Sequence, residues 1–470
     1  MEEQPERTLE QKKTIMMDER FPLSVPKNVS QDPNILDKGI QFDMADQVYD
    51  RSYIHWPNKM TTSAPGPITT GYDLINHKQF SGINFATQDY MSLCYNPSSV
   101  AAGVEALKRY GTHSGGSPLF FGKHPYYFSV LESLKKAFSR VYSNPQPAIF
   151  SAGWMAGFGV VSSLVGKRDH IIMDELCHNC LVHGAKASFA TVHKVEHLDN
   201  DAMVAKIEEI RKAHPQAGIM VISEGLFSMD SDCADLDRLQ KAAKANKAVL
   251  VVDCAHDMFG HGSKGLGNAG DKIKDFDNVI LLGSGSKSLS NNFGWAVSNK
   301  TNYPNFLNYY AGSFTFSNAL APSVAAIVGH NIDLLMSDEG DRRRKRSLEN
   351  STYVRKRLVD AGFEVIGEAS PVVIILIGSE LVSRSIANMM YSKGIIVNSV
   401  EFPACAPGDS RLRMQVQCDH TKEHLDYFVN TLTDIMPEVD QYLASDDFIK
   451  LIGEVAEKRS AAETVAAERL

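Results

Sequence analysis

The sequence has no apolar run long enough to cross a bilayer. None of its 470 residues lies in a stretch approaching the roughly 18 consecutive apolar residues of a spanning helix. The charged N-terminus also lacks the apolar centre of a secretory signal. These absences exclude an integral membrane protein, and we expect a soluble, cytoplasmic one.

Cysteine is sparse and follows no disulfide pattern. The seven cysteines are an odd number at no framework spacing, which is typical of reduced thiols in a reducing compartment. Cys177 and Cys180 form a lone C-x-x-C, and no second pair completes a zinc site. Residues 193–197 and 420–424 match H-x-x-E-H, but the first string begins in strand-like alternation and the second at a helix start. We therefore predict no metal site.

An excess of basic charge is also absent. The 48 basic and 56 acidic residues are interspersed and give a net charge of −8, so nothing indicates nucleic acid as the main partner. One basic run, 342–346, follows an acidic stretch and precedes a periodic Leu/Val segment. We interpret it as the solvated surface of a helix.

What the chain does have is a regular alternation of strand and helix patterns. This order predicts a parallel sheet covered by helices on both faces, with its chemistry at the carboxyl ends of the strands. Beyond residue 330 the pattern changes to long helices with three short strands, which favours a smaller α+β domain. The expected strands are 148–150, 171–173, 191–195, 218–223, 248–252 and 278–282, then 372–377, 395–397 and 411–416.

We accordingly divide the chain into four parts. Residues 1–80 are an N-terminal extension, charged and polar over the first 45, and expected to be a mobile arm or to lie over a partner subunit. Residues 81–330 form the large domain and 331–445 the small domain. The last segment, 446–470, is rich in Ala, Glu and Arg and is expected to be a helical tail.

One stretch organises the rest of the sequence. The apolar run 279–282 predicts a buried strand that ends in Gly-Ser-Gly-Ser, and Lys287 follows. Four small residues let a bulky ligand approach the backbone. Pyridoxal phosphate (PLP) enzymes need an amine to form a Schiff base with the cofactor aldehyde, small neighbours around the ring, and hydroxyls near the phosphate. Lys287 fits the amine and Ser284 a phosphate hydroxyl.

Two other interpretations fit the same stretch. Lys287 could be an exposed lysine in a Ser/Gly loop. Ser284-x-x-Lys287 also matches the nucleophile motif of penicillin-binding proteins, but the K-T-G and S-D-N strings of those enzymes occur nowhere in the chain.

Asp253 supplies a second constraint. It closes the apolar strand 248–252, where a buried carboxylate is costly unless it meets a cation. The protonated pyridine nitrogen of PLP is such a cation. A strand-end cap to a neighbouring amide is the alternative, but Lys287 at the next strand end favours the cofactor.

Together the ordered motifs resemble those of the α-oxoamine synthases, PLP-dependent enzymes of fold type I. The resemblance covers roughly residues 80 to 440 and implies an α/β large domain with a mostly parallel seven-stranded sheet between helices, plus a smaller α+β C-terminal domain. The stretches that carry it are 110–124, 151–156, Asp174 to His178, Glu224 to Asp230, Asp253 to His256, Ser284 to Lys287, Phe316 to Ala319 and Pro407 to Arg413.

The resemblance also implies roles for individual residues. Lys287 matches the Schiff-base lysine, Asp253 the partner of the pyridine nitrogen, His178 the histidine that stacks on the ring and His256 the one that bonds its phenolic oxygen; these four are the expected catalytic residues. The remaining expected cofactor contacts are Gly153, Trp154, Ser228 and Ser284, with Ser317 and Asn318 reaching the phosphate of a neighbouring subunit in a homodimer. The expected substrate contacts are Arg413, which matches the carboxylate-binding arginine, then Arg411 and Ser117.

The implied reaction is the decarboxylating condensation of an amino acid with an acyl thioester, carried by CoA or an acyl-carrier protein, to give an α-amino ketone. An aminotransferase on the same fold is the alternative, and a non-catalytic subunit of this fold is disfavoured because Lys287 is present. The chain departs from the family pattern at His113, Pro118, Cys254, Asp257 and Phe293. These positions bear on the substrates rather than on PLP.

Overall fold

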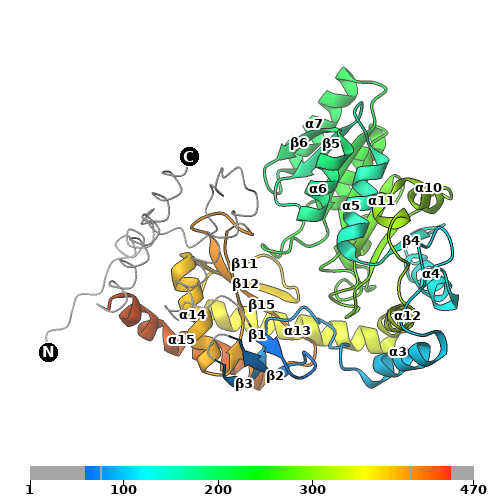
Figure 1. Cartoon of the computed structure of the whole chain (residues 1–470). Helices are drawn as coiled ribbons and strands as arrows, with labels where there is room; N and C mark the ends of the chain where they lie inside the picture. The colour runs from blue at the N-terminus through cyan, green and yellow to red at the C-terminus, as the bar shows by residue number, and fades with distance from the viewer. Residues whose placement is uncertain (1–58, 75–76, 403, 446–470) are drawn as a thin grey trace, which may run out of the picture.

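The computed structural model describes residues 59–74, 77–402 and 404–445. Most of the predicted N-terminal extension and the whole predicted tail lie outside these residues. Figure 1 shows a large α/β part beside a smaller one, with the long helix α13 running from α12 toward the smaller part. Among the described residues, no helix is both long and apolar enough to span a membrane.

Strands and helices alternate through most of the described chain. The strands are β1 (Lys59–Thr61), β2 (Ile68–Asp73), β3 (Gln79–Asn84), β4 (Gln146–Phe150), β5 (His170–Asp174), β6 (Thr191–Val195), β7 (Ile219–Glu224), β8 (Val249–Asp253), β9 (Val279–Ser284), β10 (Gly294–Ser298), β11 (Val365–Ile366), β12 (Val372–Gly378), β13 (Ile395–Ile396), β14 (Asn398–Val400) and β15 (Ser410–Gln415). The helices are α3 (Pro97–Tyr110), α4 (Pro125–Phe138), α5 (Gly153–Leu164), α6 (Asn179–Ser188), α7 (Asn200–Ala213), α8 (Leu236–Ala245), α9 (Gly267–Lys272), α10 (Tyr303–Tyr310), α11 (Gly312–Thr315), α12 (Pro322–Leu335), α13 (Asp338–Asp360), α14 (Glu380–Ser392) and α15 (Lys422–Leu443).

The large part is built on a seven-stranded sheet in the order β4-β10-β9-β8-β7-β5-β6. Only β10 runs antiparallel to its neighbours, β4 and β9. The other pairs of adjacent strands are parallel. The predicted fold class, a mostly parallel seven-stranded sheet with a smaller α+β part, is confirmed. The short Gly-Trp-Ala-Val-Ser run of β10 is the strand that sequence periodicity did not separate from the preceding loop.

Both faces of this sheet are buried, which is why its central strands are continuous apolar runs. Successive side chains of β8 point to opposite faces: Leu250 and Val252 join the core under α4, α7, α8 and α12, whereas Val251 joins the core under α5, α6 and α11. The parallel register then places the last residues of neighbouring strands side by side, with Glu224 of β7 opposite Asp253 of β8. Polar side chains at these ends share one edge of the sheet.

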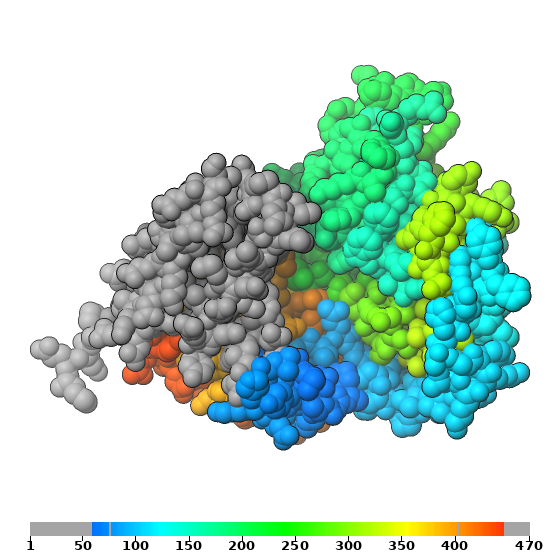
Figure 2. Space-filling view, viewed as in Figure 1, coloured from blue at the N-terminus to red at the C-terminus, as the bar shows by residue number. Residues whose placement is uncertain are grey.

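The small part combines two further sheets. The order β11-β12-β15-β14 packs against α13, α14 and α15 around an apolar core of its own. The N-terminal strands form the sheet β1-β2-β3-β13, in which β3 pairs in parallel with β13. Residues 59–74 and 77–84 therefore lie with the C-terminal part of the chain, and this segment forms part of the surface seen in Figure 2. The predicted division between 330 and 331 falls within α12.

The basic run 342–346 corrects one expectation. It is helical, in α13, but it is not a wholly solvated surface, because Arg343 is 9% and Arg344 7% exposed. Arg343 donates to the Met91 carbonyl at 2.8 Å, and Arg344 donates to the carbonyls of Leu335 at 2.6 Å and Phe259 at 3.1 Å. The helix directs two of the five cations toward buried backbone carbonyls. The charge pattern of the sequence does not reveal these acceptors, because they come from other segments of the chain.

We predict that Arg344→Met lowers stability much more than Arg342→Met does. Arg344→Met leaves two buried carbonyls without a donor and should lower the free energy of unfolding by about 2–4 kcal/mol. Arg342 pairs only with partly exposed Glu339, so its substitution should cost about 0–1 kcal/mol. Urea unfolding followed by fluorescence compares the two variants, and equal midpoints would contradict the assignment.

Candidate active site

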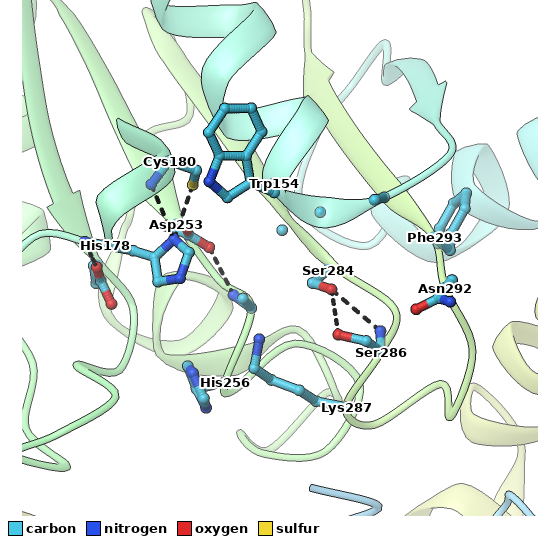
Figure 3. A pocket seen from close by; sticks show the side chains of 15 residues that line it. Trp154, His178, Cys180, Asp253, His256, Ser284, Ser286, Lys287, Asn292 and Phe293 are labelled. Carbon is cyan, nitrogen blue, oxygen red and sulfur yellow. Dashed lines mark hydrogen bonds between the residues drawn. The ribbon is translucent and has the colours of Figure 1, made fainter. Parts of the chain in front are cut away.

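A pocket of about 270 Å³ opens at the carboxyl ends of β7, β8 and β9. Its walls come from segments far apart in the sequence, which the parallel sheet brings to one edge (Figure 3). The predicted site residues that line it are Gly153, Trp154, His178, Asp253, His256, Ser284 and Lys287.

Lys287 lies three residues beyond β9, and its amine reaches into the space between His256 and Asp253 (Figure 3). Burial lowers the pKa of this amine, although the nearby Asp253 carboxylate opposes the change. An amine with a lowered pKa is more often neutral, and only the neutral amine is a nucleophile. The loop conformation depends on Gly285, whose backbone N–H donates to the Phe293 carbonyl at 2.7 Å.

Asp253 is the last residue of β8 and is 5% exposed. One of its oxygens accepts from the Ala255 N–H at 3.0 Å. Burial raises the pKa of this carboxyl, while the His178 and Lys287 charges lower it. A carboxylate withdrawn from water at the wall of a pocket is stabilised by a cationic ligand group.

His178 is the residue that caps the start of α6, and its ring contacts the first turn of that helix. Its Nδ1 accepts from the Cys180 N–H at 3.3 Å and lies 3.0 Å from the Cys180 Sγ, and its backbone N–H donates to Glu224 Oε1 at 2.6 Å. Burial lowers the pKa of His178, so the ring is mainly neutral. Donor atoms of His178, Cys180 and Asp253 all lie within 4.8 Å of one another, a set that zinc also accepts. His178 and Asp253 are, however, the residues predicted to contact the cofactor.

The opposite end of the pocket suits an anion. Helix α5 begins at Gly153 with no side chain capping its first-turn amides, and these amides carry the positive end of the helix dipole. The hydroxyls of Ser284 and Ser286 lie beside them, 2.7 Å apart. A Cβ on Gly153 would lie 2.4 Å from the Ser284 Cβ, so only glycine lets the helix approach the strand this closely.

These three features match three chemical groups of PLP. The uncapped amides and hydroxyls suit its phosphate, the Lys287 amine its aldehyde, and the Asp253 carboxylate its ring nitrogen. The residues present therefore fit the cofactor that the sequence predicts.

The other predicted site residues lie outside the pocket lining. Arg413 approaches it from β15, with Nη2 3.5 Å from His256 Nδ1. Arg411 instead donates to Asp230 and to the Met229 carbonyl, both at 2.7 Å. Ser228 follows β7, and Ser117 donates to the Thr315 carbonyl at 2.7 Å.

Ser317 and Asn318 lie beside the glycine-rich loop rather than in the pocket. The Asn318 carbonyl accepts from the Ser151 hydroxyl at 2.6 Å, and the neighbouring Ala319 N–H donates to the Gly116 carbonyl at 2.9 Å. Within one chain, these two residues are not among those that line the pocket.

Sequence reasoning did not single out several residues of the site. Glu224 is buried at the end of β7, where its position after a buried strand was the available signal. Cys180 was noted only as half of a C-x-x-C and Ser286 only as a small residue, while Tyr90 gave no signal because it joins the site through a contact with distant His256.

Comparison with known proteins decides the family. The aminotransferase class I and II family matches residues 82–432. A putative 8-amino-7-oxononanoate synthase of Desulforudis audaxviator is 31% identical over 355 residues, 75% of this chain and 89% of the relative. The chain belongs to the aminotransferase class I and II family, among the α-oxoamine synthases. The predicted family is thereby confirmed, and with it the class of PLP-dependent acyltransferases.

A further relative and two solved structures are also similar to this chain. A serine palmitoyltransferase of Sphingobacterium spiritivorum is 26% identical over 361 residues, 76% of this chain and 87% of the relative. The solved structure of Sphingomonas wittichii serine palmitoyltransferase has a TM-score of 0.78 at 23% identity, covering 87% of this chain and 99% of that one. A structure described as SPT with PLP has a TM-score of 0.79, also at 23% identity and with the same coverage.

We predict that Gly153→Ala weakens PLP binding by at least about tenfold, because the added methyl group separates the α5 amides from Ser284. Gly166→Ala is the matched control, since a Cβ there meets nothing within 4 Å. Titration of each cofactor-free variant with PLP, followed by its absorbance, gives both dissociation constants. Equal affinities in the two variants would show that the phosphate lies elsewhere.

Proposed function

We propose that this α-oxoamine synthase condenses an amino acid with an acyl thioester in its 270 Å³ pocket, with loss of CO2, to give an α-amino ketone. The observation that carries the assignment of residues is the buried Lys287 amine beside the buried Asp253 carboxylate, at the strand ends where α5 presents its amides. PLP, when bound, supplies an electron sink for the carbanion.

Each residue then has a defined task. Asp253 keeps the ring nitrogen protonated through its buried charge, and the Gly153 and Trp154 amides with Ser284 hold the phosphate. Lys287 would hold the cofactor through its aldehyde, and its amine, when free, would be the base for the Cα proton. His178 would lie against the ring, and His256 would be the donor to the phenolic oxygen.

Arg413 is proposed to bind the substrate carboxylate. It is 6% exposed, and its Nε has no hydrogen-bond partner in the described part of the chain. A guanidinium with an unused donor suits a carboxylate, which accepts two N–H groups from it. Arg411 is committed to Asp230 and is the weaker candidate. Holding the carboxylate orients the bond that breaks, which is a positioning effect.

The active form is proposed to be a cytoplasmic homodimer. Support comes from the segment around Ser317 and Asn318, where Phe120, Phe121 and Phe316 are 79%, 95% and 90% exposed. Large exposed aromatic side chains that cluster in this way are typical of a protein interface. The molar mass from light scattering should be twice the 51.8 kDa of one chain. A monomer at the concentration of the activity assay would contradict a site shared between two subunits.

We predict that Lys287→Ala lowers the rate of condensation by at least about a thousandfold, because it removes both the attachment point and the base. The assay follows CO2 release and free thiol while single amino acids are tested with acyl-CoA and acyl-carrier-protein donors. Lys300→Ala, at an exposed lysine after β10, should behave as wild type.

The same assay separates the alternatives. Amino-group transfer to a keto acid with no thioester consumed would indicate an aminotransferase. Full activity of Lys287→Ala would contradict the assignment of the lysine.

A further inference from the structure

Tyr90 connects the N-terminal segment of the chain to the pocket. Its side chain is fully buried, and its hydroxyl lies 2.8 Å from Nδ1 of His256. Its backbone carbonyl accepts from the Cys418 N–H at 2.8 Å, and the neighbouring Asp89 carboxylate accepts from the N–H groups of Leu93 and Cys94. The hydroxyl is therefore held at a fixed place by contacts that do not involve the pocket.

Arg413 is the third member of this group. Its Nη2 lies 3.5 Å from the same Nδ1 of His256, and its positive charge acts on the Tyr90 hydroxyl. Tyr90, His256 and Arg413 are 0%, 5% and 6% exposed. Water has little access to these three groups, so the contacts among them decide which nitrogen of His256 carries the proton.

The directions of these hydrogen bonds follow from the donors available. An arginine only donates, so Nδ1 of His256 accepts from Arg413, and the Tyr90 O–H is the donor to the same nitrogen. Burial raises the pKa of Tyr90 to about 12, which keeps that proton in place. Nδ1 of His256 must then be an acceptor, and the ring proton lies on Nε2.

Two observations agree with a neutral His256 in this tautomer. Burial, together with the charges of Lys287 and Arg413, lowers its pKa well below the ordinary value. Neither of the two hydrogen bonds that His256 makes among the described residues uses Nε2, and the residue lines the pocket. Its Nε2–H is thus available to a ligand.

We propose that Tyr90 is a positioning residue that fixes His256 as the Nε2–H tautomer and joins it to the arginine at the substrate side. The inference rests on the proposed function for its purpose, since His256 is there the donor to the phenolic oxygen of the cofactor. The tautomer of His256 does not depend on the cofactor, because the contacts that set it lie within the protein.

A tautomer is observable directly, which makes the first test independent of catalysis. Cofactor-free protein labelled with 15N at histidine is measured by NMR, and His256→Gln identifies the His256 signals. We expect an unprotonated Nδ1 and a protonated Nε2 in the wild type. A protonated Nδ1 would overturn the proposal, even if every Tyr90 variant failed to fold.

Tyr90→Phe removes only the hydroxyl. In this variant we expect the Nδ1 signal of His256 to move toward the protonated position, and kcat of the holoenzyme to fall about tenfold with a smaller change in KM. The control is Tyr303→Phe, because the buried Tyr303 hydroxyl has no hydrogen-bond partner among the described residues. It should leave both measurements unchanged.

The outcomes separate this inference from the function on which it rests. If Tyr90→Phe keeps the wild-type Nδ1 signal and kcat while the wild type condenses its substrates, the role of Tyr90 is wrong and the function stands. If the wild type binds no PLP but shows the expected tautomer that changes in Tyr90→Phe, the positioning by Tyr90 stands and the function fails.

Discussion

The site depends on opposite charges kept out of water at the carboxyl ends of parallel strands. Asp253 is 5% exposed, and Lys287 shares its pocket. Burial disfavours the charged form of each group, raising the pKa of the carboxyl and lowering that of the amine, while their mutual attraction opposes both shifts. The pocket between the two groups suits a ligand with a cationic group near Asp253 and a carbonyl group near Lys287.

One polar strand face joins the two parts of the chain beside the pocket. On β15 the side chains of Leu412 and Met414 enter the core of the small part, and Arg411 and Arg413 lie on the other face. Arg411 reaches Asp230 of the large part, whereas Arg413 reaches Tyr90 and His256. The same strand therefore joins the parts and delivers an arginine to the substrate side, so that a shift between the parts would move Arg413 relative to Lys287.

Much of this arrangement was predictable from local sequence. Lys287 and Asp253 stand after apolar strands, where burial of a charge has few explanations, and the small residues 283–286 indicate close approach by a ligand. The strand order could not be predicted beyond the family resemblance, because residues 294–298 show no pattern that separates β10 from the Lys287 loop before it. The direction taken by each basic residue of 342–346 depends on loop carbonyls far away in the sequence, and the pairing of Tyr90 with His256 is likewise a contact between distant segments.

The central claim is that Lys287 is the residue to which PLP attaches, and reductive trapping tests it most directly. Purified holoenzyme is treated with borohydride, digested, and analysed by mass spectrometry for a peptide carrying the reduced cofactor. The account predicts one modified peptide, with the cofactor on Lys287. A cofactor on another lysine, or none after saturation with PLP, would contradict it.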